Sequence, residues 1–375
     1  MAPPDSRQAK TKLAPDRSGD RVTVLLPLPL GRGYTYGVPA DLDLAPGDFV
    51  AVPLGPRTVT GVVWDREPED VPAGKLKSVL ERLPAPPLPD VSRRFVEWVA
   101  AYNMSSWGAV LKMAMSVPAA LQPEKSVRAY VAAPDPPPFK MTKARERVLA
   151  VLAEGPARTG ADIASEAGAG ASVIKGLADA GVLARADLAP PPAFEIPDWA
   201  AEGPTLSTDQ QTAAEALCKD VKSGGFGVTV IEGVPGSGKT EVYLEAVAAA
   251  LEQGKQALVM LPEIALSAQW LRRFRARFGV APAVWHSDLT GVQRRRTWRA
   301  VADGQARVVV GARSSLYLPF ANLAVIAVDE EHDQSFKQDE GVIYNARDMA
   351  VVRAQLGEIP AILVTATPSL ETDQN

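Results

Sequence analysis

The stretch that most constrains the fold is GVPGSGKT, at residues 233–240. It follows the apolar run GVTVIE and opens an amphipathic run, so it has the strand–turn–helix setting that the pattern G-x-x-x-x-G-K-[ST] requires. Gly233, Gly236 and Gly238 let successive backbone N–H groups approach phosphate oxygens, and the helix N-terminus adds partial positive charge. The stretch therefore predicts an α/β layer that binds the phosphates of ATP.

The loop supplies most of the expected nucleotide ligands. We expect Lys239 to reach the β- and γ-phosphates, as a catalytic residue, and the Thr240 hydroxyl to ligate Mg²⁺. The full set expected to bind ATP from this loop is Gly233, Val234, Pro235, Gly236, Ser237, Gly238, Lys239 and Thr240.

A second apolar run, residues 323–328, ends in Asp329, Glu330, Glu331 and His332. Such a charge cluster is usually a solvated loop. A phosphate-binding loop, however, needs an acidic metal site at the end of a neighbouring strand, which favours a functional interpretation here. We expect Asp329 to hold Mg²⁺ through the coordination shell of the ion. We expect Glu330 to act as the catalytic base that polarises the attacking water.

Composition indicates a soluble, cytoplasmic protein of several domains. The chain has 375 residues, 46% of them hydrophobic, a net charge of −4 and one cysteine, so no internal disulfide or cysteine-built zinc site is expected. No apolar run approaches the roughly 20 residues that span a bilayer. Residues 1–20 are polar and rich in proline, which predicts a flexible tail. Because the net charge is negative, any contact with nucleic acid must come from local basic patches.

Proline clusters at residues 84–89, 134–138 and 190–192 predict stiff linkers or domain boundaries. Short β-rich runs separated by Gly and Pro turns occupy residues 21–83, and one or two helices follow, which predicts a small domain over 21–118. Residues 140–190 predict three short helices and a terminal strand, in the order of a winged helix. Lys175 is the one cation of its third helix, so weak DNA contact and a scaffold role both remain open.

Several ordered motifs resemble superfamily-2 helicases: DEEH, LPEIALSAQ, WHSDL, GARSSLYLPF and TATPS. The longer stretches GVPGSGKTEVY, DEEHDQSFKQDEGVIYNARDMAVVRA and TATPSLET resemble the family of primosomal protein N′, the replication-restart DNA helicase PriA. The resemblance implies a multidomain α/β chain: a β-rich N-terminal DNA-binding domain, a winged helix, and one RecA-like P-loop lobe over residues 204–375. It implies ATP-driven 3′-to-5′ movement on DNA at stalled forks, with single-stranded DNA-binding protein and other primosome proteins as partners.

The resemblance also implies roles for single residues. Gln210 in LSTDQQ would contact adenine, and the helicase box would be Asp329, Glu330, Glu331 and His332. Phe336 and Tyr344 would stack on bases or else pack in the core, and two basic runs, 272–278 and 293–299, would follow DNA or be solvated helix faces. Residues expected to couple DNA to nucleotide state, or to contact DNA, are Glu263, Arg313, Phe336, Lys337, Tyr344, Arg347, Thr365 and Thr367.

In the N-terminal domain, Tyr34, Thr35, Gly55 and Lys77 match the family's pocket for the 3′ end of DNA. An aromatic face, close backbone approach and a cation suit a terminal nucleotide. The family commonly has an acidic residue where this chain has Thr35, which weakens the expected contact with the 3′ hydroxyl.

The resemblance fails after TATPSLET. The family continues with a cysteine-rich zinc region and a second RecA-like lobe, so we expect this sequence to be a truncated form, with zinc only in a full-length form and without a complete motor. The alternative hypothesis is a non-catalytic module that binds forked DNA and partner proteins.

Overall fold

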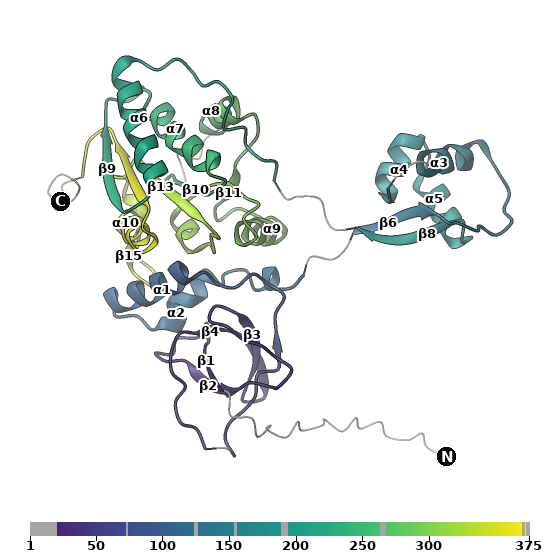
Figure 1. Ribbon diagram of the computed structural model, residues 1–375, viewed down its shortest axis with the longest axis horizontal. Coiled ribbons are helices and arrows are strands. Elements are labelled where there is room, and N and C mark those ends of the chain that lie inside the picture. Colours follow the sequence, from purple (N-terminus) through teal and green to yellow (C-terminus); the bar gives the residue numbers. More distant parts are fainter. Residues whose placement is uncertain are drawn as a thin grey trace. The chain divides into compact units, whose positions relative to one another are not determined.

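The computed structural model describes residues 21–72, 74–123, 127–153, 156–188, 194–262, 268–369 and 372. The expected tail, residues 1–20, and Glu263 lie outside this range. The chain forms two compact units, one of residues 1–122 with 193–375 and one of residues 123–192. Figure 1 shows the ribbon of both units. Across the described ranges, no helix combines the length and apolar character needed to cross a bilayer.

The larger unit begins with a five-stranded antiparallel sheet in the order β2-β1-β4-β3-β5. Alternate residues of its strands face two different hydrophobic cores. Val50 and Val52 pack in a core formed by the β-rich domain itself, whereas Phe49 packs in the core shared with the helices. The segment after Leu76 pairs with Gly37 through Lys77 and with Ala51 through Leu80, so it joins the two ends of the sheet. The strands are β1 (Arg21–Leu25), β2 (Tyr34–Gly37), β3 (Phe49–Leu54), β4 (Arg57–Trp64) and β5 (Glu81–Arg82).

Two helices, α1 (Asp90–Tyr102) and α2 (Trp107–Ala114), follow this sheet, with a short 3-10 helix η1 (Pro118–Leu121) after them. The proline cluster at 84–89, predicted as a stiff linker or boundary, packs against the core of this unit. Ala85 and Leu88 are buried in the core shared with these helices. The Pro84 carbonyl accepts a hydrogen bond from Arg299 Nη1 at 2.9 Å. The prolines prevent a regular helix or strand here, but the apolar side chains between them pack into the core and fix the segment in place.

The second part of this unit is a six-stranded parallel sheet with helices on both faces, as expected for a RecA-like lobe. The sheet order is β11-β12-β10-β13-β16-β9. Helices α6 (Thr208–Ser223), α7 (Lys239–Glu252) and α8 (Ala268–Phe278) cover one face, and α9 (Gly291–Ala302) and α10 (Ala346–Gly357) the other (Figure 1). The strands are β9 (Gly227–Glu232), β10 (Gln256–Met260), β11 (Ala283–Trp285), β12 (Val308–Gly311), β13 (Leu323–Asp329) and β16 (Pro360–Thr365).

Short elements complete the lobe. They are the 3-10 helices η3 (Arg313–Tyr317) and η4 (Gln334–Phe336) and the two-stranded ribbon β14 (Lys337–Gln338) with β15 (Tyr344–Asn345). Because all six strands of the large sheet are parallel, β9, β13 and β16 end at the same edge. The three motifs that follow these strands are thereby brought together.

The lobe and the β-rich domain share one hydrophobic core. Trp298 of α9 stacks edge-on against Phe49 of β3, with ring centroids 5.9 Å apart, and its Nε1 donates to Ala114 O at 3.1 Å. The buried Arg353 of α10 lies 5.4 Å above the Phe95 ring of α1 and donates to Ser92 Oγ at 3.3 Å. These contacts make the two parts one packed body.

The smaller unit has three helices, α3 (Lys143–Ala153), α4 (Gly160–Ala167) and α5 (Ala171–Asp179), over a sheet in the order β7-β6-β8. Its strands are β6 (Val127–Ala132), β7 (Arg158–Thr159) and β8 (Leu183–Leu188). β6 pairs along its whole length with β8 and therefore belongs to this unit. The unit thus starts before residue 140, the first residue that the sequence predicted for it. The winged-helix assignment stays a prediction.

Candidate nucleotide site and 3′-end pocket

The loop between β9 and α7 depends on its glycines. Gly236 and Gly238 both have φ of +81°, a left-handed conformation that side chains with a Cβ resist. A Cβ on Gly233 would lie 2.7 Å from Ser237 Oγ, and one on Gly238 would lie 2.4 Å from Gln210 Nε2. The loop therefore holds its backbone N–H groups at the start of α7 only because these positions lack side chains.

Lys239 is the first residue of α7, and its ammonium group is held inside the loop. Nζ donates to Gly233 O at 2.5 Å and to Val234 O at 3.2 Å. The Gly233 N–H in turn donates to Thr365 O at 3.2 Å, which ties the loop to the end of β16. Phosphate oxygens can replace the two carbonyls as partners of this ammonium.

Gln210 braces the loop from α6. Its Oε1 accepts from Ser207 N at 2.8 Å in a capping box at the start of α6, and its Nε2 donates to Ser237 O at 2.7 Å. Both ends of the amide are thus engaged by the protein itself. The predicted reading of adenine by Gln210 would have to use the amide's remaining donor and acceptor capacity.

Asp329, at the end of β13, belongs to a buried hydrogen-bond chain. The Tyr243 hydroxyl donates to Asp329 Oδ2 at 2.9 Å and accepts from Trp270 Nε1 at 2.7 Å. Burial raises the pKa of Asp329 to about 6, although the hydrogen bond from Tyr243 acts in the opposite direction. Thr240 is a further hydrogen-bonding neighbour of Tyr243, so this phenol joins the two predicted Mg²⁺ ligands. Hydroxyl and carboxylate oxygens suit Mg²⁺, so the residues present fit the ion.

Glu330 adopts a left-handed conformation with φ of +53°, which is strained for a residue with a side chain. Its side chain remains 42% exposed, next to His332 at 3.7 Å. His332 Nδ1 contacts the buried Thr365 hydroxyl at 2.8 Å, and this hydroxyl also binds the backbone of Thr367. The turn after β13 is therefore joined directly to the turn after β16.

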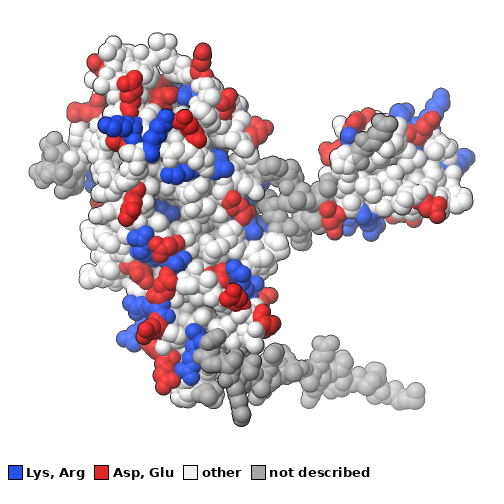
Figure 2. All heavy atoms as spheres, viewed as in Figure 1, with Lys and Arg blue, Asp and Glu red and all other residues white. Residues whose placement is uncertain are grey.

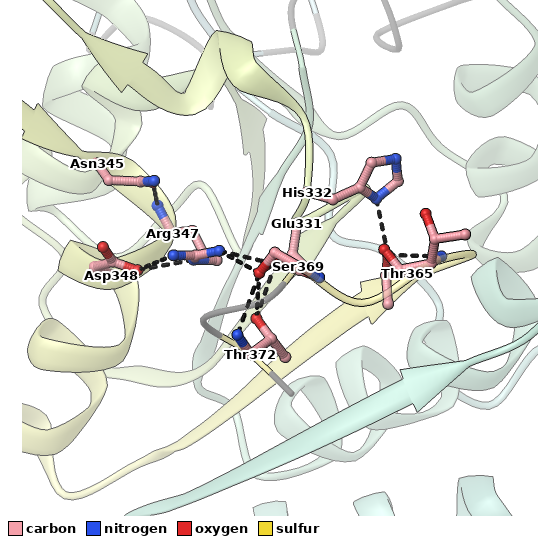
Figure 3. Close-up of polar contacts among 9 residues, drawn as sticks. Glu331, His332, Asn345, Arg347, Asp348, Thr365, Ser369 and Thr372 are labelled. Carbon is pink, nitrogen blue, oxygen red and sulfur yellow. Dashed lines mark hydrogen bonds and ion pairs between the residues drawn. The ribbon is translucent and has the colours of Figure 1, made fainter. Parts of the chain in front are cut away.

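Glu331 belongs to a buried network of polar contacts, drawn in Figure 3. Its carboxylate accepts from Arg347 Nη1 at 3.2 Å, from Ser369 N at 2.9 Å and from Thr372 Oγ1 at 3.0 Å. Burial alone would raise the pKa of Glu331, but these hydrogen bonds outweigh it and hold the pKa below its usual value. Arg347, predicted to lie near DNA phosphates, is instead buried here because it neutralises Glu331 and pairs with Asp348.

Phe336 and Tyr344 do not present their rings to solvent, which corrects the base-stacking interpretation. They are only 1% and 4% exposed, and Tyr344 packs edge-on against Tyr317 with centroids 5.7 Å apart. The apolar rings fill the core beneath the ribbon of β14 and β15, which is the alternative left open from the sequence. Lys337 in the same ribbon is exposed, and its backbone carbonyl accepts a hydrogen bond from Arg313 Nη1.

The two basic runs are partly engaged by other protein groups. Arg277 is buried and bidentate with Glu245, at 2.7 and 3.0 Å, and Arg299 pairs with Asp303 at 3.0 Å. Arg294 lies 5.2 Å above the Trp285 ring. On the face shown in Figure 2, basic and acidic side chains are interspersed over most of the surface. The face drawn in Figure 2 therefore does not support DNA contact through a broad basic surface.

The β-rich domain contains a pocket of about 510 Å³ beside β2. Three of the four residues predicted for 3′-end recognition line it, namely Tyr34, Thr35 and Lys77, while Gly55 follows the lining residue Leu54 in a turn with φ of +60°. Arg32 and Lys75 add two cations, and Glu69 adds a carboxylate. The size lies within the range of small-ligand sites, and the mixture of aromatic, cationic and acidic groups suits one nucleotide.

Comparisons with known proteins match both parts of the larger unit. Residues 23–116 match the 3′ DNA-binding domain of PriA, and residues 207–375 match the DEAD/DEAH box helicase family. The replication restart protein PriA of Rickettsia felis is 34% identical over 359 residues, covering 94% of this chain and 43% of that protein. PriA of Haemophilus influenzae is 36% identical over 366 residues, covering 94% of this chain and 50% of that protein.

The chain belongs to the PriA family. PriA of Bacillus subtilis is 42% identical over 167 residues, 44% of this chain and 21% of that protein. The chain spans about half the length, or less, of these curated PriA relatives. A solved structure of RecG bound to a three-way DNA junction has a TM-score of 0.34 and 21% identity, over 47% of this chain and 24% of that chain, which carries no functional argument.

Some residues that organise these PriA sites were not singled out from the sequence. Tyr243 lies in the stretch GKTEVY four residues after Lys239, and only the fold shows that it reaches Asp329. Glu69 has no sequence signal, since it lies in an irregular segment 34 residues from Thr35. Among the described residues, no cluster of three or more His, Cys, Asp or Glu side chains could hold a metal ion.

Proposed function

We propose that this chain is a component of an ATP-dependent replication-restart DNA helicase, which binds ATP with Mg²⁺ at the sheet edge and, independently, a DNA 3′ end in the β-rich domain. The observation that carries the proposal is the presence of both sites in one packed body with a continuous core. Family membership supports cytoplasmic action on forked DNA with 3′-to-5′ polarity. It also supports primosome proteins and single-stranded DNA-binding protein as partners, and a winged helix at residues 140–190.

In the proposed nucleotide site each group has a separate task. The backbone of the 233–238 loop and Lys239 bind the phosphates, while Thr240 and Asp329 would hold Mg²⁺, whose charge would neutralise the charge that develops on the phosphates. Glu330 orients the water that attacks the γ-phosphate. His332 and Thr365 pass the change at the phosphates to the turn after β16, because they are hydrogen-bonded to each other at 2.8 Å.

Nucleotide and DNA binding test the proposal separately. In the Lys239→Ala variant we expect ATP affinity to fall about 10- to 100-fold, since one charge-assisted phosphate contact contributes about 1.5 to 3 kcal/mol. Binding of forked DNA with a free 3′ end should be retained. Lys255→Ala, a partly exposed lysine after α7, is the matched control.

Two outcomes would contradict the proposal: unchanged ATP affinity in Lys239→Ala, or equal wild-type affinity for forked DNA with and without an accessible 3′ end. DNA binding without any ATP hydrolysis, in an assay with single-stranded DNA, would favour the non-catalytic fork-binding module instead.

A further inference from the structure

Helix α8 carries a tryptophan whose indole group is hydrogen-bonded inside the lobe. Trp270 is only 6% exposed, and its Nε1 donates to the Tyr243 hydroxyl on α7 at 2.7 Å. The Tyr243 hydroxyl donates in turn to Asp329 Oδ2 at the end of β13, at 2.9 Å. Two buried hydrogen bonds therefore connect α8 with a predicted ligand of Mg²⁺.

The three groups allow only one direction of donation along this chain. An indole N–H donates and cannot accept, an ionised carboxylate accepts and cannot donate, and a phenol has a single proton. Because Trp270 donates to the oxygen of Tyr243, the proton of that phenol is directed to Asp329. Without the indole N–H, the phenol oxygen would lose a buried partner and the hydroxyl would be free to turn away from Asp329.

The position of the indole is fixed by the packing of α8 on α7, which lies on the same face of the sheet (Figure 1). Arg277 of α8 is bidentate with Glu245 of α7, at 2.7 and 3.0 Å. The Trp270 ring stacks on Phe274, with ring centroids 5.6 Å apart and 21° between the ring planes. The indole is thus a rigid support for the phenol, because both its helix and its ring are held.

A ligand of Mg²⁺ depends on support of this kind. Mg²⁺ requires near-ideal octahedral geometry, so a carboxylate that rotates out of place binds it less tightly. Substitution of a group that is hydrogen-bonded to a metal ligand typically lowers metal affinity about 10- to 100-fold. Tyr243 is such a group for Asp329, and it also lies beside Thr240, the other predicted Mg²⁺ ligand.

We propose that Trp270 is a positioning residue of the Mg²⁺ site, which acts on Asp329 through the hydroxyl of Tyr243. The inference rests on the proposed function of the nucleotide site and extends that site from the sheet edge to α8. Metal affinity thereby depends on where α8 lies against α7.

The test measures binding of the metal ion rather than turnover. The full chain is titrated with a fluorescent, non-hydrolysable ATP analogue in EDTA and again in Mg²⁺, and the ratio of the two affinities gives the contribution of the ion. We expect Tyr243→Phe to lower this ratio about 10-fold. Trp270→Phe should lower it about 3-fold, because its support is one bond further from the ion. Affinity in EDTA should stay within about twofold of the wild type in both variants.

A double variant separates action through the phenol from an independent effect. If Trp270 acts only through Tyr243, the variant with both residues changed to Phe should have the same ratio as Tyr243→Phe alone. Trp298→Phe is the matched control, because its buried Nε1 also loses a hydrogen bond, to Ala114 O at 3.1 Å, on the other face of the sheet. It should keep the wild-type ratio.

Three results would overturn the inference and leave the proposed nucleotide site intact. They are an unchanged ratio in Trp270→Phe, a further loss in the double variant, and an equal loss of affinity with and without Mg²⁺, which would show a role in folding alone. The proposed metal site itself would be wrong if Mg²⁺ failed to strengthen binding in the wild type, or if Asp329→Asn left the ratio unchanged.

Discussion

The hydroxyl of Tyr243 donates a 2.9 Å hydrogen bond to Oδ2 of Asp329, and both groups are buried. Tyr243 comes from the helix that begins at the phosphate-binding loop, and Asp329 is the last residue of β13, two strands away from β9 in the sheet. The bond therefore fixes the orientation of the predicted Mg²⁺ ligand relative to the loop before any metal binds.

Removal of this hydroxyl should destabilise the lobe. In Tyr243→Phe, the two buried hydrogen bonds that this hydroxyl makes, from Trp270 Nε1 and to Asp329 Oδ2, are lost, so we expect a loss of about 1 to 3 kcal/mol in the free energy of unfolding, measured with urea. Tyr317→Phe is a matched control, because the buried Tyr317 hydroxyl has only the Tyr344 hydroxyl beside it, outside full hydrogen-bond geometry, and no carboxylate partner in the described structure. That variant should be neutral or slightly stabilised, and an equal loss in both variants would contradict the role given to the bond.

Asp329 should make stability depend on pH in the nucleotide-free protein. Its pKa is raised by burial from 3.8 to about 6, so between these values the folded protein binds more protons than the unfolded chain. The resulting stabilisation is present below about pH 4 and is lost as the pH rises through about 6. The difference in pKa corresponds to about 3 kcal/mol.

The measurement for this prediction compares wild type with Asp329→Asn, which cannot titrate. Urea unfolding between pH 4 and pH 7 should show wild-type stability falling relative to the variant as the pH rises. Parallel curves for the two proteins would show that Asp329 titrates at an ordinary value.

Three features of the lobe could be predicted from the sequence: the phosphate-binding loop, the acidic turn after β13 and the parallel sheet. Each of them depends on short sequence patterns with local physical causes. The burial of Phe336 and Tyr344 could not, since an aromatic residue in a polar stretch suits base stacking and core packing equally well. The same holds for Arg347, whose partner Glu331 lies 16 residues away. These side chains are placed by the tertiary contacts of α10 and the turn after β16.

The Arg347–Glu331 ion pair should be strongly coupled. Its side chains are only 7% and 0% exposed, so removing one partner leaves a buried charge. We expect Arg347→Met to lower the free energy of unfolding by about 3 to 5 kcal/mol. In a double-mutant cycle with Glu331→Gln, the double variant should be more stable than the sum of the single losses implies.

The exposed pair of Lys222 and Glu252 is the control for this cycle, at 2.7 Å on the surface of α6 and α7. It should show no measurable coupling because solvent screens both charges. Additive losses at Arg347 and Glu331 would mean that the network in Figure 3 does not act as a unit.

Gly238 and Gly236 share the same φ of +81° but differ in their surroundings. A Cβ on Gly238 would meet Gln210 Nε2 at 2.4 Å, whereas a Cβ on Gly236 has open space around it. Gly236→Ala should cost about 1 to 2 kcal/mol of stability from backbone strain alone. Gly238→Ala should cost more, and Gln210→Ala in that background should recover part of the excess. Equal costs at the two glycines would show that the contact with Gln210 is unimportant.

The packing of Trp298 against Phe49 and Ala114 has a mechanical consequence. A protein that held a DNA terminus on a flexible tether would let tension dissipate in the tether before it reached the nucleotide lobe. Here the β-rich domain, for which 3′-end binding is proposed, is joined to the lobe by buried aromatic rings and by Arg353. A force applied to a DNA strand bound by the β-rich domain would therefore reach the lobe through side-chain contacts, with the stiffness of a protein interior.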